Sequence, residues 1–231
     1  GDRLTGTPGF SGDGGVVFVG TYDRKLHAVH ASLGEVLWKR DLPGEMKVEP
    51  LWANGALIVA CGDGTLIALR GPKPEDEVWR VRLDGSPGAL TLHEGLIYVA
   101  TSDNSISCVD TARGQRLWRR SIGTTVSGRP QRVGSAVCAA GRDGRISFLD
   151  AQTGEPLWSY EAGGGVFGGI QISESLVLFG CDDQFFYALD TASKLVAWKC
   201  RTRGRNRAGS AVAAGRLYFM SEESLYAVDL N

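Results

Sequence analysis

The amino-acid sequence predicts an all-β fold, and two regular spacings carry this prediction. Tryptophan recurs at Trp38, Trp79, Trp118, Trp158 and Trp198, with spacings of 41, 39, 40 and 40 residues. Aspartate recurs at every fortieth position from Asp23 to Asp183, and no segment shows sustained helical periodicity. Each period of about 40 residues has room for four short strands separated by turn residues. This arithmetic predicts a β-propeller of six four-stranded antiparallel blades.

The first repeat illustrates the four expected strands and the turns between them. Residues 16–19 form an apolar run, and a turn containing Asp23 separates it from a second run at 26–29. A Ser-Leu-Gly turn at 32–34 then leads into a strand centred on Trp38. The remaining strand precedes the first apolar run, as residues 128–133 do in a later repeat. The recurring Asp is interpreted as a turn residue that accepts backbone hydrogen bonds, and the recurring Trp as a contact between blades.

The blades are expected at residues 5–43, 44–84, 85–123, 124–162, 163–203 and 204–231 plus 1–4. Residues 2–6 match the end of a Trp-bearing strand, so the N-terminal segment is predicted to pair with the last blade and close the ring without an exposed edge. All 231 residues are then one domain, expected to be part of a larger protein. A truncated ring of seven or eight blades is the alternative.

The composition excludes several functional classes. The net charge is −1, which gives no global field for nucleic acid, and no run of 18 apolar residues predicts a membrane span. The 32 glycines have no collagen period and are assigned to hairpin turns and crowded inner strands. The five scattered cysteines are expected to be buried free thiols in a cytoplasmic, monomeric domain. A periplasmic protein with one disulfide remains the alternative.

The repeat also resembles a known family. Residues 109–118 (VDTARGQRLW) and 149–158 (LDAQTGEPLW) resemble the A-x-D-x-x-T-G-x-x-x-W repeat of PQQ-like, quinoprotein-type β-propellers. Residues 141–146 resemble that family's Asp-Gly turn, whereas residues 71–77 replace the Thr-Gly turn of the second repeat by a longer loop. WD40 propellers share the period, but the chain has no Gly-His or Trp-Asp dipeptide.

The resemblance implies relatives of several kinds. They include kinase-associated sensor propellers, the C-terminal propeller of acyl-CoA-synthetase-like amino-acid-activating enzymes, and scaffold lipoproteins of outer-membrane assembly. It also implies quinone-dependent dehydrogenases, which carry about eight blades, lid loops, adjacent cysteines and calcium. This chain has no adjacent cysteines, and we therefore expect no quinone, metal or other cofactor and no catalytic residue.

No nucleophilic motif or metal-ligand spacing appears in the sequence. His27 and His30 are three residues apart on an expected strand and point to opposite faces. Cys61 and Cys181 occupy the same repeat position three blades apart, which is too far for a disulfide or a shared zinc in a closed ring. The glycine-rich residues 163–169 join two strands, so we interpret them as a crossover rather than a phosphate-binding loop.

Charge is distributed unevenly along the chain. Residues 1–115 carry a net charge of −4 and residues 116–231 a net charge of +3. Four arginines alternate in one expected crossover, and two more lie in an equivalent connection: Arg201, Arg203, Arg205 and Arg207, with Arg129 and Arg132. If their guanidinium groups converge at the channel mouth, they suit a carboxylate, a phosphate or an acidic protein surface. A solvated loop is the simpler interpretation.

The position just inside each inner strand is small in four of six repeats, and Glu49 and Arg129 are its charged exceptions. These two are candidates for binding a small polar ligand or for pairing with each other. Trp52, outside the tryptophan series, is expected on the same strand as Glu49. The function predicted is a non-catalytic binding or sensing module for a protein or a small polar or anionic ligand. A periplasmic scaffold resembling outer-membrane assembly lipoproteins is the alternative, and a quinone-dependent dehydrogenase fragment a second one.

Overall fold

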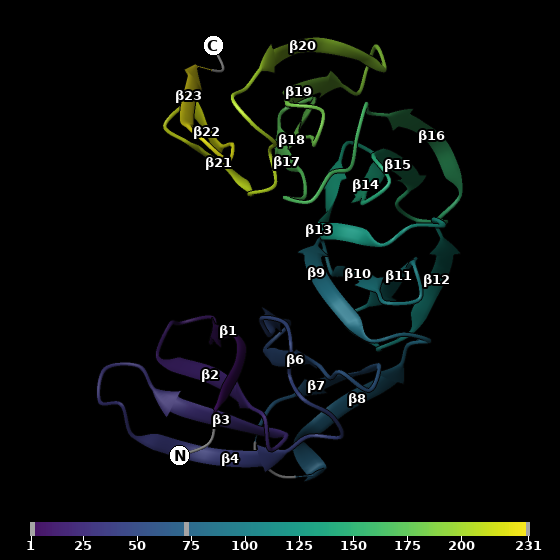
Figure 1. The fold of residues 1–231 in the computed structure, drawn as a ribbon. Helices are drawn as coiled ribbons and strands as arrows, with labels where there is room; N and C mark the ends of the chain where they lie inside the picture. The colour runs from purple at the N-terminus through teal and green to yellow at the C-terminus, as the bar shows by residue number, and fades with distance from the viewer. Residues whose placement is uncertain (1–2, 72–73, 230–231) are drawn as a thin grey trace. The chain divides into compact units, whose positions relative to one another are not determined.

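The computed structural model describes residues 3–71 and 74–229, and these residues form six small antiparallel sheets (Figure 1). The chain divides into two compact units, one of residues 1–103 and 107–119 and the other of residues 104–106 and 120–231. No helix among the described residues is long and apolar enough to cross a membrane.

The first three sheets contain twelve strands and a short 3-10 turn, η1, among the described residues. Their bounds are β1 (Leu4–Phe10), β2 (Val16–Thr21), β3 (Lys25–His30), β4 (Val36–Asp41), β5 (Leu51–Ala53), β6 (Ala56–Ala60), β7 (Thr65–Leu69), η1 (Pro74–Asp76), β8 (Glu77–Arg82), β9 (Pro87–His93), β10 (Leu96–Thr101), β11 (Ser105–Asp110) and β12 (Arg116–Ser121). In each sheet the strands follow one another in chain order.

The last three sheets have the same meander order. Their strands are β13 (Val126–Val133), β14 (Ala136–Gly141), β15 (Arg145–Asp150), β16 (Pro156–Glu161), β17 (Gln171–Ser173), β18 (Leu176–Gly180), β19 (Phe185–Asp190), β20 (Leu195–Arg201), β21 (Ser210–Ala213), β22 (Arg216–Met220) and β23 (Leu225–Asp229). The predicted all-β class is confirmed, and five of the six sheets have four strands among the described residues. The blade number and the closure of a ring stay predictions.

The expected N-terminal clasp differs from the structure at residues 3 and 4. Leu4 begins β1 and pairs with Thr21 of the first sheet, and the Tyr22 N–H donates to Arg3 O at 3.1 Å. Leu4 is the first residue of β1 and Arg3 precedes it, and both pair with the chain at the end of β2, so they belong to the first sheet. Gly1 and Asp2 lie outside the described residues, and so do Leu230 and Asn231 at the other end. The last sheet, β21–β22–β23, has three strands in the described part of the chain.

Within each unit, the core consists of apolar layers between neighbouring sheets. Strand β6 shows why its sequence is apolar without alternation, because both of its faces are buried. Ile58 packs in a cluster with Val99 of β10, while Leu57 and Val59 pack in a cluster with Phe18 of β2. In the second unit, equivalent layers lie between β13–β16 and β17–β20 and between β17–β20 and β21–β23.

The recurring aspartates make the turns between the second and third strand of their sheets, as predicted. Asp63, Asp143 and Asp183 each accept the backbone N–H two residues later, at 3.0, 3.1 and 3.0 Å. Asp23 and Asp103 accept from the hydroxyl two residues earlier. The fixed period of the aspartates is therefore a requirement of turn geometry.

The recurring tryptophan has a defined partner in the first unit. The Trp79 indole N–H donates to Thr111 O at 2.7 Å, and the side chain is 8% exposed. Gly114 closes the same turn with a φ of +66°, and a Cβ there would lie 2.5 Å from Trp79 Cδ2. The Trp strand of one sheet is thus covered by the Asp-Thr-x-x-Gly turn of the next sheet, which confirms the expected contact between neighbouring repeats at this position.

Candidate functional site: an arginine-rich loop cluster and an aromatic pocket

The four alternating arginines lie where β20 ends and the following loop begins. Arg201 is the last residue of β20, and Arg203, Arg205 and Arg207 are exposed in the loop 202–209. The residues between the arginines are less exposed, and two of them, Thr202 and Asn206, are buried. Asn206, 1% exposed, donates from Nδ2 to Cys181 O at 3.3 Å, Phe185 O at 3.2 Å and Thr202 Oγ1 at 2.8 Å. The buried amide holds the loop so that the arginines face solvent.

Arg207 is fixed by an acidic partner. Its Nε donates to Asp182 Oδ1 at 2.9 Å and its Nη2 to Asp182 Oδ2 at 2.6 Å, a two-point pairing of guanidinium and carboxylate. These hydrogen bonds lower the pKa of Asp182 and raise that of Arg207. Asp182 lies in the turn between β18 and β19, so the pairing joins that turn to the loop 202–209.

An exposed aromatic ring lies next to this ion pair. Phe167, 39% exposed, has the Arg207 guanidinium 5.0 Å from its centroid and the Arg142 guanidinium 6.0 Å from it. These distances fall within the range of cation–π attraction. Phe167 belongs to the loop 162–170 between β16 and β17, and Arg142 to the turn between β14 and β15. Three segments therefore meet at this ring. They are the turn between β14 and β15, the loop between β16 and β17, and the loop between β20 and β21.

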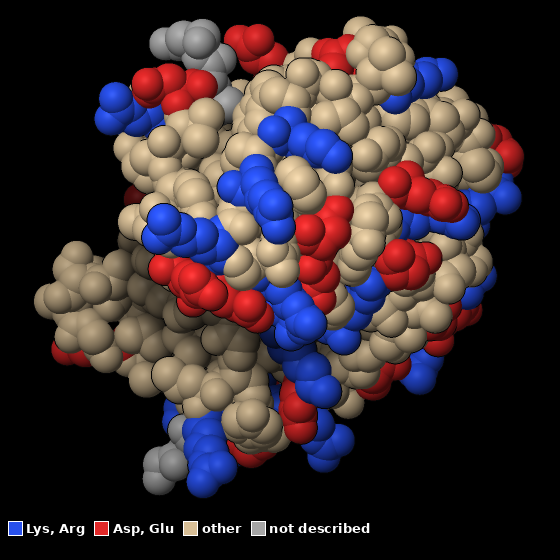
Figure 2. Space-filling model, turned by 45° about the horizontal axis from the view of Figure 1, so that its top comes forward, with Lys and Arg blue, Asp and Glu red and all other residues tan. Residues whose placement is uncertain are grey.

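The remaining loop arginines extend this surface toward the last sheet. The backbone N–H of Arg205 donates to Glu222 Oε2 at 3.2 Å, and the backbone N–H of Arg203 donates to the Tyr226 hydroxyl at 2.8 Å. We call the group Arg142, Phe167, Asp182, Arg203, Arg205, Arg207 and Glu222 the arginine cluster. It contains carboxylates as well as guanidinium groups, and Figure 2 shows acidic and basic side chains interspersed on the face that it draws. The cluster is a mixed-charge surface around an aromatic ring.

Arg129 and Arg132 come from β13 of the same unit. Arg132 is half-buried and donates from Nη1 to Ala136 O at 3.2 Å, which ties its side chain to its own hairpin. Arg129 is exposed, and its neighbour Gly128 approaches Gly169 of the loop 162–170 through the backbone.

Glu49 and Trp52 lie in the first unit and do not share a strand. Glu49 is half-buried and precedes β5, whereas Trp52 is in β5. The expectation of a common strand is wrong because β5 begins only at Leu51. Arg129 belongs to the other unit, so its pairing with Glu49 stays a prediction.

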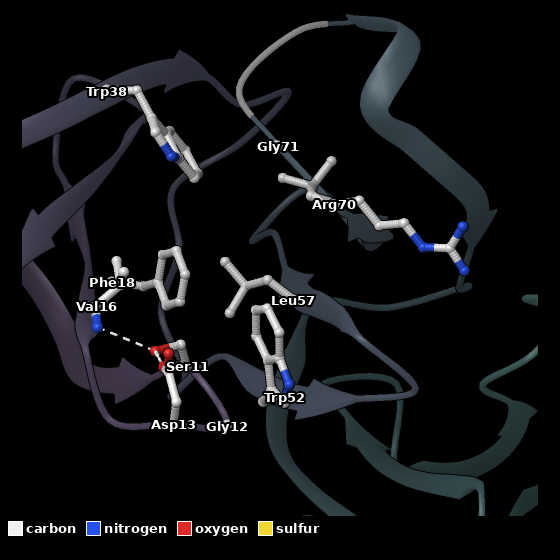
Figure 3. A pocket seen from close by; sticks show the side chains of 11 residues that line it. Ser11, Gly12, Asp13, Val16, Phe18, Trp38, Trp52, Leu57, Arg70 and Gly71 are labelled. Carbon is white, nitrogen blue, oxygen red and sulfur yellow. Dashed lines mark hydrogen bonds between the residues drawn. The ribbon is translucent and has the colours of Figure 1, made fainter.

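Trp52 lines a pocket of about 520 Å³ in the first unit (Figure 3). Its ring stacks on Phe18 with centroids 6.1 Å apart, and Phe18 in turn meets Trp38 at 5.9 Å. Leu57 and Leu69 add apolar walls, and Ser11, Asp13 and Arg70 supply polar groups. The aromatic side chains come from the first and second sheets and converge in the figure, whereas the Arg70 guanidinium points away from them.

The described residues contain no group of three or more His, Cys, Asp and Glu side chains arranged to hold a metal ion. Cys61, Cys108, Cys138 and Cys181 are buried, Cys200 is half-buried, and all are free thiols. Burial raises the pKa of Cys61 to about 11 and that of Cys181 to about 12.

Sequence reasoning missed Phe167, Asp182 and Arg142, the residues that organise the arginine cluster. Phe167 did carry a signal, because it is the one aromatic residue within the glycine-rich residues 163–169. The glycines around it permit close packing, since a Cβ at Gly168 would overlap Ala208 O of the next loop. The pairing of Asp182 with Arg207 joins residues 25 apart, and no periodic pattern indicates it.

Comparison with known proteins gives a family and a fold. A family model described as outer membrane protein assembly factor BamB matches residues 2–73 and 102–231. The structure is similar to BamB from Moraxella catarrhalis, with a TM-score of 0.59 and 21% identity over 98% of this chain and 82% of that one. It is also similar to the computationally designed Ika8 protein, with a TM-score of 0.77 and 17% identity over 97% of this chain and 70% of that one.

A curated relative matches over a shorter stretch. Tetrathionate hydrolase from Acidithiobacillus ferrooxidans is 25% identical over 100 residues, which are 42% of this chain and 20% of the hydrolase. The chain thus spans a fifth of that protein's length. The family match confirms the predicted PQQ-like β-propeller repeat.

Proposed function

The chain belongs to the family described as outer membrane protein assembly factor BamB, and from this membership we propose that it is a non-catalytic scaffold that binds other proteins. The observation that carries the proposal is the length of the match, which leaves only residue 1 and residues 74–101 outside it. The periplasm is accordingly the proposed compartment. This choice takes the scaffold alternative in preference to a cytoplasmic sensing module.

The arginine cluster is the proposed contact surface for a protein partner. Arginine and aromatic side chains contribute a large share of binding energy in protein interfaces. Here two guanidinium groups lie within about 6 Å of the Phe167 ring, and these contacts restrict its position before a partner arrives. The carboxylates of Asp182 and Glu222 lie among the arginines, which favours a partner surface that carries both charges. A polyanion has no positive groups to pair with the carboxylates of Asp182 and Glu222.

The proposal is tested by affinity capture from cell-envelope extract of a bacterium that encodes the chain. Wild type is compared with the pair Arg203→Glu/Arg205→Glu and with Phe167→Ala, and captured proteins are identified by mass spectrometry. The matched control is Arg82→Glu/Arg113→Glu, which makes the same charge change at side chains that are 74% and 78% exposed in the other unit.

We expect wild type and the control to capture the same outer-membrane assembly proteins, and both test variants to recover at least about fivefold less, a loss of about 1 kcal/mol. Equal recovery by all four proteins removes the arginine cluster as the contact surface. Capture of no envelope protein by wild type overturns the scaffold proposal itself.

A further inference from the structure

A cavity of about 270 Å³ lies between the end of β12 and the strands β15 and β16. Its lining residues belong to 120–122 and 145–159, all within the second unit. Three serines, Ser121, Ser147 and Ser159, are among them, and we call the cavity the serine pocket. It shares no residue with the arginine cluster.

Strand β15 presents two polar side chains to the serine pocket. Ile146 and Phe148 pack on the other face of the strand, in the core cluster shared with β17–β20. Because side chains alternate along a strand, Arg145 and Ser147 face the pocket, and Ser159 of β16 lies directly opposite Ser147 in the strand register. Two small hydroxyl side chains therefore form part of the pocket wall.

The equivalent place in the next sheet is filled by large side chains. Tyr187 and Lys199 stand 40 residues after Ser147 and Ser159 and form the same cross-strand pair. The Tyr187 ring lies 6.2 Å from the ring of Tyr160, and Lys199 Nζ lies 5.7 Å from the Tyr187 centroid. The serine pocket therefore results from small residues at two positions that the next repeat fills.

The hydroxyls of the serine pocket are available to a bound molecule. Ser147 is 8% exposed, yet its hydroxyl has no hydrogen-bond partner among the described residues. The hydroxyls of Ser121 and Ser159 also have none in the part of the chain that the structure describes. Buried hydroxyls are normally hydrogen-bonded, because an unsatisfied one keeps its desolvation cost. The Ser147 hydroxyl therefore indicates a place for a bound acceptor.

The charged side chains that line the described pocket are two arginines. Arg120 donates from Nε to Gly154 O at 2.9 Å and from Nη2 to Glu155, and Arg145 donates from Nη2 to Glu161 Oε1 at 2.9 Å. These bonds orient each guanidinium group and use only some of its five N–H donors. The side chains of Glu155 and Glu161 are 66% and 72% exposed, so these ion pairs contribute little and an anion in the pocket can compete with them.

We propose that the serine pocket binds a small phosphate monoester. Its phosphoryl oxygens accept hydrogen bonds from the guanidinium groups of Arg120 and Arg145 and from the serine hydroxyls. Its carbon chain lies against Leu157, an apolar lining residue that is 48% exposed.

The donors and the size of the pocket favour this class of ligand. A phosphate group presents three acceptor oxygens in different directions, which suits donors from two walls better than a planar carboxylate does. The volume lies just below the range of about 300–1,000 Å³ typical of sites for drug-sized ligands, so the pocket suits a molecule of a few carbon atoms. The inference does not rest on the proposed scaffold function, and its test needs no protein partner.

The test is a calorimetric titration of glycerol 3-phosphate into the 231-residue protein. The buffer contains no phosphate and little salt, because salt screens the attraction between exposed charges. We expect one binding site for glycerol 3-phosphate and no measurable binding of glycerol. Inorganic phosphate, which lacks the carbon chain, and glycerate, whose anionic group is a carboxylate, are each expected to bind at least about fivefold more weakly.

Two protein variants locate the binding site. Arg145→Gln is expected to weaken binding at least about tenfold, the usual order for a lost hydrogen bond to a charged group. Ser147→Tyr, which introduces the side chain of the next repeat, is expected to fill the pocket and abolish binding. The matched control is Arg216→Gln in the same unit, because Arg216 is 56% exposed and pairs with Asp229 of the neighbouring strand at 2.7 Å. It is expected to bind as wild type does.

Four outcomes overturn the proposal. The first is that wild type does not bind glycerol 3-phosphate, and the second is that inorganic phosphate binds equally well, which shows attraction of a simple ion. The third is equal affinity for glycerate, which removes the preference for phosphate. The fourth is an equal loss in Arg145→Gln and Arg216→Gln, which shows that binding depends on total charge and not on this pocket. If Ser147→Tyr does not fold, the two arginine variants still decide the question.

Discussion

Gly114 has no Cβ, and this allows the second and third sheets to pack closely at Trp79. Its φ of +66° is strained for other residues, and an added Cβ overlaps the Trp79 ring. Gly34 is a matched control, because it has a φ of +71° but no atom within 4 Å of the place that a Cβ would occupy. We expect Gly34→Ala to lower the free energy of unfolding by about 1 kcal/mol and Gly114→Ala by about 2 kcal/mol more.

Denaturant unfolding, followed by tryptophan fluorescence, measures both variants. The additional loss in Gly114→Ala is expected to accompany a red shift of Trp79 emission, since the indole moves away from Thr111 O. Equal losses in the two variants contradict the packing role of Gly114 and leave backbone strain as its whole effect.

The ion pair of Asp182 with Arg207 makes the stability of the fold depend on pH. The hydrogen bonds of Asp182 with Arg207 lower its pKa in the folded protein from the ordinary value of 3.8. The pairing therefore stabilises the fold above about pH 4 and ceases to do so as the pH falls through the lower folded pKa. We expect Asp182→Asn to melt a few degrees below wild type at pH 7, with a difference that shrinks steadily below pH 3.8.

The measurement is the melting temperature of both proteins between about pH 2.5 and 7, a range that runs from above the ordinary carboxyl pKa to below it. Glu174→Gln, which changes an exposed carboxylate in the turn before β18, is the control and is expected to follow wild type throughout. A difference between Asp182→Asn and wild type that stays constant down to the acid end of this range is incompatible with this role of the ion pair.

The loop 202–209 is the element that presents most of the arginine cluster, and Asn206 holds it. Its amide donates to two backbone carbonyls and a hydroxyl in a buried site, and truncation removes all three bonds. Each carbonyl keeps a backbone N–H donor, since Cys181 O also accepts from Gln184 and Phe185 O from Cys181. We expect Asn206→Ala to lower the free energy of unfolding by about 1–3 kcal/mol and to speed amide hydrogen exchange in residues 181–185 and 202–209.

Arg203→Ala provides the comparison for this element. The side chain of Arg203 is exposed, and the hydrogen bonds of this residue to Tyr226 and Ser221 are made by its backbone. Its replacement is expected to change stability by less than about 0.5 kcal/mol. If Asn206→Ala and Arg203→Ala have the same effect, the loop is held by its backbone contacts and not by the buried amide.

Sequence reasoning predicts elements well here because their determinants are local and periodic. The strands, the Asp turns and the covered tryptophan all repeat with the 40-residue spacing, so each copy supports the others. The departure of residues 71–77 from the repeat is also visible in the sequence. The arginine cluster depends on pairs such as Asp182 with Arg207 and Arg142 with Phe167, which only the approach of separate loops creates.

The burial of the thiols is a property of the whole molecule. It determines whether the thiols stay reduced in an oxidising compartment. Free cysteines favour a reducing environment, whereas the proposed scaffold function assigns the chain to the periplasm. Burial reconciles the two. A thiol reacts as its thiolate, and burial raises the pKa of Cys61 to about 11 and of Cys181 to about 12, so neither is appreciably ionised at neutral pH. Such thiols persist even where disulfides form readily.

We therefore expect the native protein to show a single slowly accessible thiol at pH 7, that of the half-buried Cys200, and to show all five after unfolding in denaturant. Titration with a chromogenic disulfide reagent measures both states, and Cys200→Ser removes the native signal. The melting temperature is expected to be the same with and without reductant, because no disulfide joins the five free thiols of the fold. A protein purified from the periplasm that loses stability on reduction contradicts this account, since it then contains a disulfide that replaces two of the buried thiols.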